Sequence, residues 1–152
     1  NAMLSIIQRV SHADVRINKQ ITGSIQQGIV ALLGIEKADT QTEAERLIER
    51  ILNYRIFDDH QGKMNLSLRD IQGGLLLIPQ FTLAANTDKG NRPSFSRSAE
   101  PSIAQPLFKF AVQHAQQQHP FIAAGHFAAD MQVTLCNDGP VTFTLKTSPP
   151  KK

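Results

Sequence analysis

Several short apolar segments that predict β-strands are separated by only two long helical segments, and this order restricts the possible folds. Residues 28–35 form a nearly continuous apolar run, which is typical of a buried strand. A second such run, residues 75–78, follows Gly73-Gly74 and ends at Pro79, since proline lacks the amide donor that a regular central strand position needs. The pattern predicts an α+β fold with a mostly antiparallel, barrel-like sheet and two main helices.

Other regions complete the predicted sheet. The apolar and β-branched residues of 4–10 predict a strand, and alternating residues within 15–25 predict a hairpin. Residues 127–136 predict a late strand. Residues 137–140 are typical of a tight turn, which is expected to lead into a last strand at 141–145.

The more distinct of the two helices follows Thr40-Gln41-Thr42-Glu43, a segment that resembles a capping box. Apolar residues then recur at helical spacing, and we expect this stripe to face the core; its members are Ala44, Leu47, Ile48, Ile51 and Leu52. The second helix is predicted for residues 101–118. One of its faces carries Ile103, Leu107, Phe110 and Ala111.

The length of 152 residues is most simply explained by one domain, which we predict for residues 3–146. Residues 1–2, which precede Met3, are interpreted as a cloning remnant, and residues 147–152 are expected to form a flexible tail. The formal net charge is +3, and two of these charges come from the last two lysines. Composition alone therefore does not indicate a nucleic-acid partner.

The single cysteine excludes an internal disulfide, which is consistent with a reducing compartment. No apolar run approaches the roughly 20 residues that span a bilayer, and we identify no signal peptide. A cytoplasmic protein without a membrane partner is therefore expected.

Familiar catalytic and metal-binding patterns are absent from the sequence. It contains no Gly-x-Ser-x-Gly elbow and no His-Glu-x-x-His pair, and its five histidines are not arranged as a ligand cluster. We therefore expect no metal site. Cys136 has no obvious base beside it in sequence, and we expect a small buried side chain there rather than a nucleophile.

Two polar segments lie at predicted strand ends. In Pro79-Gln80-Phe81-Thr82-Leu83-Ala84-Ala85, no base is visible that would activate the Thr82 hydroxyl. We expect Thr82 to be a strand residue that lines a site without acting as the nucleophile. Asn137-Asp138-Gly139-Pro140-Val141-Thr142 contains a Gly-Pro bond, for which a cis peptide is accessible. Its residue types fit either an ordinary hairpin turn or a site built from main chain.

Both segments, in this order, resemble those of D-aminoacyl-tRNA deacylases of the common bacterial and eukaryotic type. The resemblance extends from Met3 nearly to Leu145. It includes Leu32-Leu33-Gly34-Ile35, Tyr54-Arg55-Ile56-Phe57, Gly62-Lys63-Met64-Asn65-Leu66, Arg92-Pro93-Ser94-Phe95-Ser96 and residues 127–133. Pro79 is a departure, because the family usually has serine at this position.

The resemblance implies the family's fold, a homodimer and no cofactor. It further implies that a cis Gly139-Pro140 peptide enters the other subunit's active site, where its main chain rejects L-amino acids. Arg9 matches the family's arginine beside this loop, although a surface ion pair would explain it equally well. The same resemblance assigns Gln80, Phe81 and Thr82 to the catalytic site. It assigns Pro79, Phe127, Ala128 and Met131 to substrate binding, with the last three near the pocket for the terminal adenosine.

The implied reaction is hydrolysis of the ester between tRNA and a D-amino acid or a mischarged glycine, without a protein nucleophile. Two other functions stay open. One is a non-catalytic protein that binds the 3′ end of tRNA, and the other is a small-ester hydrolase that depends on Thr82 or Cys136. Lys89, Arg92 and Arg97 either contact RNA phosphates or belong to a solvated loop.

Overall fold

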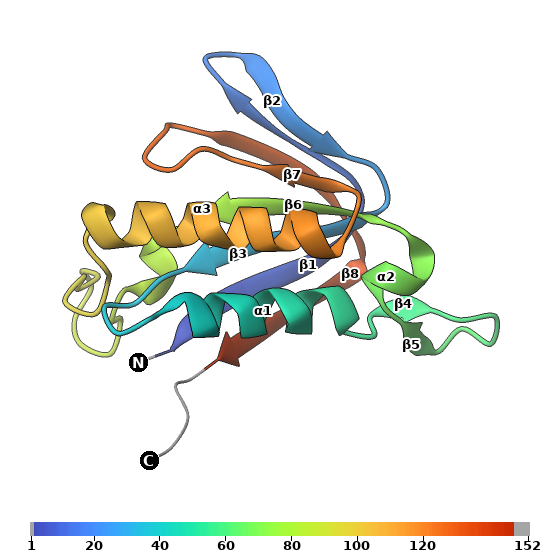
Figure 1. Ribbon diagram of the computed structural model, residues 1–152, viewed down its shortest axis with the longest axis horizontal. Helices are drawn as coiled ribbons and strands as arrows, with labels where there is room; N and C mark the ends of the chain where they lie inside the picture. Colours follow the sequence, from blue (N-terminus) through green and yellow to red (C-terminus); the bar gives the residue numbers. More distant parts are fainter. Residues whose placement is uncertain (1, 148–152) are drawn as a thin grey trace.

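The computed structural model describes residues 2–147, which form a curved six-stranded sheet with two long helices side by side over one face (Figure 1). These helices are α1 (Gln41–Asn53) and α3 (Pro101–Gln118). The strands of the sheet are β1 (Met3–Ile17), β2 (Gln20–Ile25), β3 (Gly28–Gly34), β6 (Gly74–Pro79), β7 (Ile122–Ala124) and β8 (Gln132–Thr147). The remaining elements are β4 (Phe57–Asp58), β5 (Met64–Leu66), the short helix α2 (Leu68–Ile71) and the 3-10 turn η1 (Phe81–Ala84).

Strand β1 organises the sheet, because three other strands pair with it and all three are antiparallel to it. It pairs with β3 through residues 4–10, with β2 through residues 13–17, and with β8 through residues 3–16. Strand β6 adds to β3, and β7 adds to β6, in parallel pairs. The predicted α+β fold with a mostly antiparallel, barrel-like sheet is confirmed.

The apolar run at β3 is continuous because both faces of this strand are buried. Ile29, Ala31 and Leu33 belong to a core cluster that includes the buried residues of α1 and α3. Val30, between them, belongs to a second cluster formed with residues of β1 and β6 on the opposite face. A strand that is covered on both faces has no solvent-facing positions for polar residues.

Helix α1 has the predicted apolar stripe, and all five of its residues are fully buried. Its capping differs from the expectation. The Thr40 hydroxyl accepts the amide of Thr42 and donates to the Glu43 carboxylate, so the two side chains bond each other. A reciprocal capping box is found instead at α2, between Ser67 and Asp70.

Helix α3 has the predicted bounds. Of the four residues that the sequence places on one face, Leu107 and Ala111 are buried, Phe110 packs against the core, and Ile103 is 47% exposed. The buried residues are Ala104, Leu107, Phe108, Ala111 and Ala115. Three of these five are alanines, which a pattern of large apolar residues does not single out.

Two predictions about the last strand are wrong. Residues 127–131 form a turn rather than a strand, and β8 begins at Gln132. Residues 137–140 do not reverse the chain, because β8 continues through them and pairs with β1 on both sides. These turn-type residues instead shift the pairing register within one long strand.

The C-terminal end of the described region also differs from the expectation, whereas the burial of Ala2 does not test whether residues 1–2 are a cloning remnant. Thr147 was assigned to the tail, but it pairs with Met3 and is buried, with its hydroxyl donating to the Glu43 carbonyl. Ala2, assigned to a cloning remnant, is buried and donates its amide to Glu36. Asn1 and residues 148–152 lie outside the described residues. None of the helices within residues 2–147 has the length and apolar character needed to cross a membrane.

Asp39, just before α1, gives the fold a specific pH dependence. Burial raises the pKa of its carboxyl from 3.8 to about 6, although the hydrogen bond from the Glu36 amide opposes this rise. The folded state therefore holds the proton more tightly than the unfolded chain, and the ionised group destabilises folding as pH rises from about 4 to 6. Lower pH removes this cost.

We expect Asp39→Asn to gain stability relative to the parent as pH rises from 4 to 7. The raised pKa corresponds to a gain on the order of 1 kcal/mol. Urea unfolding of both proteins across this pH range measures the difference. If the difference in free energy of unfolding between the two proteins is the same at every pH, the pKa of Asp39 is not raised in the folded state.

Candidate functional site

An uncharged cavity of about 480 Å³ lies where β6, the turn before β8 and the start of α3 meet. Its described lining contains one polar side chain, the amide of Gln80, and no titratable group. The lining residues are Ile78, Pro79, Gln80, Phe81, Ala99, Pro101, Phe127, Ala128, Ala129, Met131 and Val133. This composition suits an apolar or aromatic ligand that one amide orients.

The end of β6 brings the first polar segment to the cavity. Pro79 is the last residue in register with β3, opposite Leu33. The backbone N–H of Gln80 donates to the Leu33 carbonyl at 2.8 Å. The chain then turns into η1, which packs closely over Gly34. A side chain there would place its Cβ 2.6 Å from the Cβ of Leu83, so only glycine allows this approach.

Within this segment, Gln80 and Thr82 form a side-chain pair. The Gln80 Nε2 atom donates to the Thr82 Oγ1 atom at 2.6 Å. Thr82 lies in η1, so the expectation that it is a strand residue is wrong. No titratable group within residues 2–147 hydrogen-bonds its hydroxyl, and the contact with Gln80 orients the amide at the cavity wall.

The opposite wall is the turn that precedes β8. Phe127 and Met131 are half-buried there and contact the two core clusters. Ala128 has a positive φ of 63° and is exposed. The turn, rather than the expected strand, lets both large side chains contribute to one cavity.

The second polar segment forms a wide bulge in β8. Gln8 pairs with Thr142 and Val10 pairs with Asn137, so residues 138–141 face the single residue Arg9. Residues 138–140 are exposed. The Gly139–Pro140 peptide bond is cis, as predicted.

Arg9 fixes this bulge from beneath. Its side chain is buried, and its Nε atom donates to the Asp138 carbonyl at 3.0 Å while Nη1 donates to the Ile56 carbonyl at 2.8 Å. The Asp58 and Asp138 carboxylates lie 3.6 and 3.9 Å away, respectively, and balance its charge. The alternative of a surface-paired arginine is wrong, because the guanidinium holds backbone inside the fold.

The side chain of Asn137 holds the bulge from within. Its Oδ1 atom accepts the Val141 amide at 3.0 Å, and its Nδ2 atom donates to the Thr142 hydroxyl at 3.1 Å. Together with Arg9, Asn137 therefore anchors the two ends of the bulge, and residues 139–140 between them form an exposed tip. The main chain of the tip is thus exposed to solvent.

The structure therefore places the predicted site residues in two locations. Six line the cavity, namely Pro79, Gln80, Phe81, Phe127, Ala128 and Met131, and Thr82 contacts it through Gln80. Arg9, Gly139 and Pro140 lie elsewhere. Val133 lines the cavity and is six residues before Gly139, a separation of roughly 20 Å along an extended strand.

Comparison with known proteins identifies the family of this chain. The sequence profile described as D-Tyr-tRNA(Tyr) deacylase matches residues 6–146. The chain belongs to the D-Tyr-tRNA(Tyr) deacylase family. The family resemblance identified from the sequence is confirmed, and with it the expectation of a hydrolase-family chain.

Individual relatives of this deacylase-family chain agree in sequence and fold. The chain is 58% identical over 143 residues to the D-aminoacyl-tRNA deacylase of Pseudoalteromonas translucida (strain TAC 125), covering 94% of this chain and 99% of the relative. A solved structure described as c-Myc DNA Unwinding Element Binding Protein superposes with a TM-score of 0.91 at 37% identity, covering 97% and 99% of the two chains. A probable eukaryotic D-amino acid tRNA deacylase shares the fold, with a TM-score of 0.82 at 13% identity over 97% and 100% of the chains.

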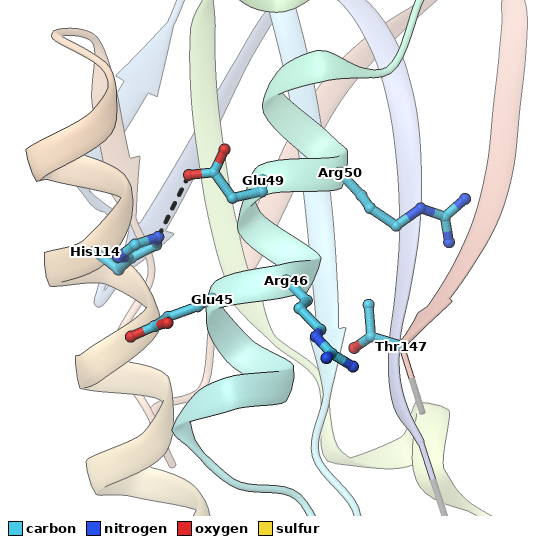
Figure 2. A pocket seen from close by; sticks show the side chains of 6 residues that line it. All are labelled: Glu45, Arg46, Glu49, Arg50, His114 and Thr147. Atoms are coloured by element: carbon cyan, nitrogen blue, oxygen red, sulfur yellow. Dashed lines mark ion pairs between the residues drawn. The ribbon is translucent and has the colours of Figure 1, made fainter. Parts of the chain in front are cut away.

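A larger cavity of about 590 Å³ in this deacylase-family chain lies against the outer side of α1 and contains none of the predicted site residues (Figure 2). It is lined by Glu45, Arg46, Glu49, Arg50, His114 and Thr147. His114 of α3 points toward Glu49 of α1, with 3.6 Å between the Nε2 and Oε1 atoms. Among the described residues, no group of three His, Cys, Asp or Glu side chains is placed to bind a metal ion, here or elsewhere.

Sequence reasoning missed part of the site. Ala99, Pro101 and Val133 line the cavity, but small apolar residues carry no chemical signal. Cys136 was expected to be buried, yet its side chain is exposed on β8. The anchoring role of Asn137 had a signal, since asparagine commonly bonds nearby backbone, but its position in a bulge depends on pairing with β1.

Proposed function

We propose that this chain hydrolyses the ester between a D-amino acid and the 3′-terminal ribose of tRNA, in the cytoplasm. The family, and the name D-aminoacyl-tRNA deacylase carried by its relatives, support this reaction. The observation that carries the proposal is the cavity without a titratable lining residue. Such a cavity suits a nucleobase and an ester that are positioned rather than attacked by the protein.

In this proposal the terminal adenosine occupies the cavity between the walls that contain Phe81 and Phe127, with Met131 beside it. Stacking on such groups is sequence-tolerant and favourable. The Gln80 amide, held by Thr82, orients the aminoacyl group. An aminoacyl ester is already activated, and positioning alone can supply roughly 7–11 kcal/mol of a barrier. The adjacent 2′-hydroxyl of the RNA assists hydrolysis, so no protein nucleophile is required.

Selection against L-amino acids is assigned to the main chain at Gly139–Pro140 of a second copy. The exposed, anchored tip and its separation from the cavity on the same chain support a symmetric homodimer. A D-residue points its side chain away from the inserted loop, whereas an L-residue with the same anchors collides with it. Glycine has no side chain to collide, so glycyl-tRNA is also a substrate.

Incubation with D-tyrosyl-tRNA, L-tyrosyl-tRNA, glycyl-tRNA and a small ester tests this proposal. We expect release of D-tyrosine and glycine, and neither L-tyrosine release nor small-ester hydrolysis above the uncatalysed rate. Binding of tRNA without any turnover would support a non-catalytic RNA-end binding protein instead. Small-ester hydrolysis that is lost in Thr82→Ala or Cys136→Ala would support the side-chain-dependent hydrolase.

Thr82→Val and Cys136→Ala are expected to retain most deacylation, within about tenfold of the parent. Neither side chain has a hydrogen-bonded base among residues 2–147, and removing a true nucleophile costs on the order of 10⁴-fold or more. The Thr82 variant should lose more than the Cys136 variant, because it frees the Gln80 amide. Single-turnover rates on D-tyrosyl-tRNA measure this, and a 10⁴-fold loss in either folded variant would refute it.

A further inference from the structure

Two exposed aromatic rings lie together at the edge of the cavity. The side chains of Phe81 and Phe95 are 58% and 44% exposed, although phenylalanine is usually buried. Their ring centroids are 5.4 Å apart with planes tilted by 48°. Since Phe81 also lines the cavity, the two rings extend its apolar surface outward.

The loop that carries Phe95 is closed by its own backbone hydrogen bonds and joined to the end of β3 just after it. Asn86 and Ser94 exchange two backbone hydrogen bonds of 2.7 and 2.9 Å. Four residues beyond Phe95, the Ala99 amide donates to the Ile35 carbonyl, and Ala99 itself lines the cavity. The rings are therefore held next to the cavity entrance.

The same loop is positively charged. Residues 86–98 contain three cations, Lys89, Arg92 and Arg97, and one carboxylate, Asp88. All three cations are exposed, and none forms a salt bridge with any residue in the described part of the chain. An exposed aromatic pair with cations in the same loop matches the chemistry of single-stranded nucleic acid, which offers stacking faces and phosphates.

We propose that this surface, formed by Phe81, Phe95, Lys89, Arg92 and Arg97, binds the unpaired nucleotides that precede the terminal adenosine. A base stacks against the Phe95 ring beside Phe81, and the cations contact the phosphates. The inference rests on the proposed function, because it requires the terminal adenosine in the adjoining cavity. A paired base would not fit, since its faces are covered by its neighbours in the duplex.

Binding of unacylated RNA tests this without any catalytic step. The probes are fluorescein-labelled cytidylyl-cytidylyl-adenosine and adenosine monophosphate, the latter by competition. We expect the parent to bind the trinucleotide more tightly, and Phe95→Ala to reduce this preference by about 5- to 150-fold, the range for loss of one base–aromatic stack. Phe95→Tyr should retain the preference. Phe121→Ala, which removes a ring that is 52% exposed outside this surface, is the matched control.

Salt dependence tests the cations. Each phosphate contact to a single strand contributes about 0.7 to the slope of log K against log salt. We expect a smaller magnitude of this slope for the trinucleotide in a variant that combines Lys89→Ala, Arg92→Ala and Arg97→Ala. Lys63→Ala, in the loop between β4 and β5, should leave the slope unchanged.

The proposal is overturned if the parent binds the trinucleotide no more tightly than adenosine monophosphate, or if Phe95→Ala and Phe121→Ala retain equal preference. It is also overturned if only a protein partner competes for the surface. Failure of the proposed reaction would appear separately, as a parent that prefers the trinucleotide but releases no amino acid from D-tyrosyl-tRNA. Circular dichroism and melting of each variant exclude misfolding as the cause.

Discussion

Gly139→Ala is expected to lower the turnover of D-aminoacyl-tRNA by about 100-fold or more while the protein stays folded. Gly139 has a φ of 137°, which L side chains rarely adopt, and an added Cβ would lie 2.7 Å from Val141 Cγ2 and 3.1 Å from Arg9 Nη2. The bulge must shift to accommodate it, and a displacement of about 1 Å at a positioning group costs on the order of 100-fold. Single-turnover deacylation measures the effect.

Gly62→Ala separates the backbone cost from the effect on the site. Gly62 also has a positive φ, 74°, but nothing lies within 4 Å of its added Cβ, and it belongs to the loop between β4 and β5. Both variants should lose comparable backbone stability, and only Gly139→Ala should lose activity. Parent-rate hydrolysis of D-tyrosyl-tRNA by Gly139→Ala, with L-tyrosyl-tRNA still excluded, would show that the bulge is only a structural feature of β8.

The proposed contribution of Gly139 to a second copy can be examined by mixing inactive variants. Gly139→Ala has an intact cavity, whereas Phe127→Ala has an intact bulge. If each site combines the cavity of one copy with the bulge of the other, a mixed dimer has one intact site, and random mixing restores about a quarter of the parent activity. No recovery in dimers shown to be mixed would contradict insertion between copies.

Arg9→Met should lower both stability and turnover. The guanidinium donates to two backbone carbonyls and lies near two carboxylates, all from two other segments of the chain, residues 56–58 and residue 138. Its loss leaves the buried Ile56 carbonyl without this donor, at a cost of about 1–3 kcal/mol in the free energy of unfolding. It also releases the base of the bulge, so we expect turnover to fall about 10- to 100-fold. Urea unfolding and single-turnover deacylation measure the two effects.

Arg16→Met on the same strand is the matched control for Arg9. Its side chain is 48% exposed and pairs with Asp14 at 3.5 Å, and exposed pairs of this kind contribute about 0–1 kcal/mol. Arg9→Lys should give an intermediate result, because an ammonium cannot donate along the two directions of the guanidinium fork. If Arg9→Met and Arg16→Met behave alike, Arg9 does not anchor the bulge.

The elements predicted well from sequence are those whose side-chain periodicity reflects local geometry. The stripe from Ala44 to Leu52 identified α1, and the uninterrupted run at residues 28–35 identified a strand buried on both faces. The turn residues Asn18 and Lys19, both with positive φ, likewise join β1 and β2 as expected. In each case the signal lies within a single element.

The failures concern features that depend on a distant partner. The residues at 137–140 suit a hairpin and a bulge equally, and only the pairing of β8 with β1 on both sides decides between them. Thr82 follows a buried strand, but the close approach permitted by Gly34 turns the chain into η1. Cys136 is exposed because no residue from 132 to 140 is buried, so neither face of this half of β8 is covered, a fact that no local pattern contains.

The central position of β1 also determines when the protein becomes active during its synthesis. β1 is translated first, but its Arg9 contacts a carbonyl 129 positions later in the chain. At about 5–20 residues per second, the ribosome takes roughly 6 to 26 seconds to supply that partner. Until then, the edge of β1 that receives β8 is open to other nascent strands. The bulge forms only after nearly the whole chain has emerged, so under the proposed function a ribosome-bound intermediate lacks the loop that would reject L-amino acids.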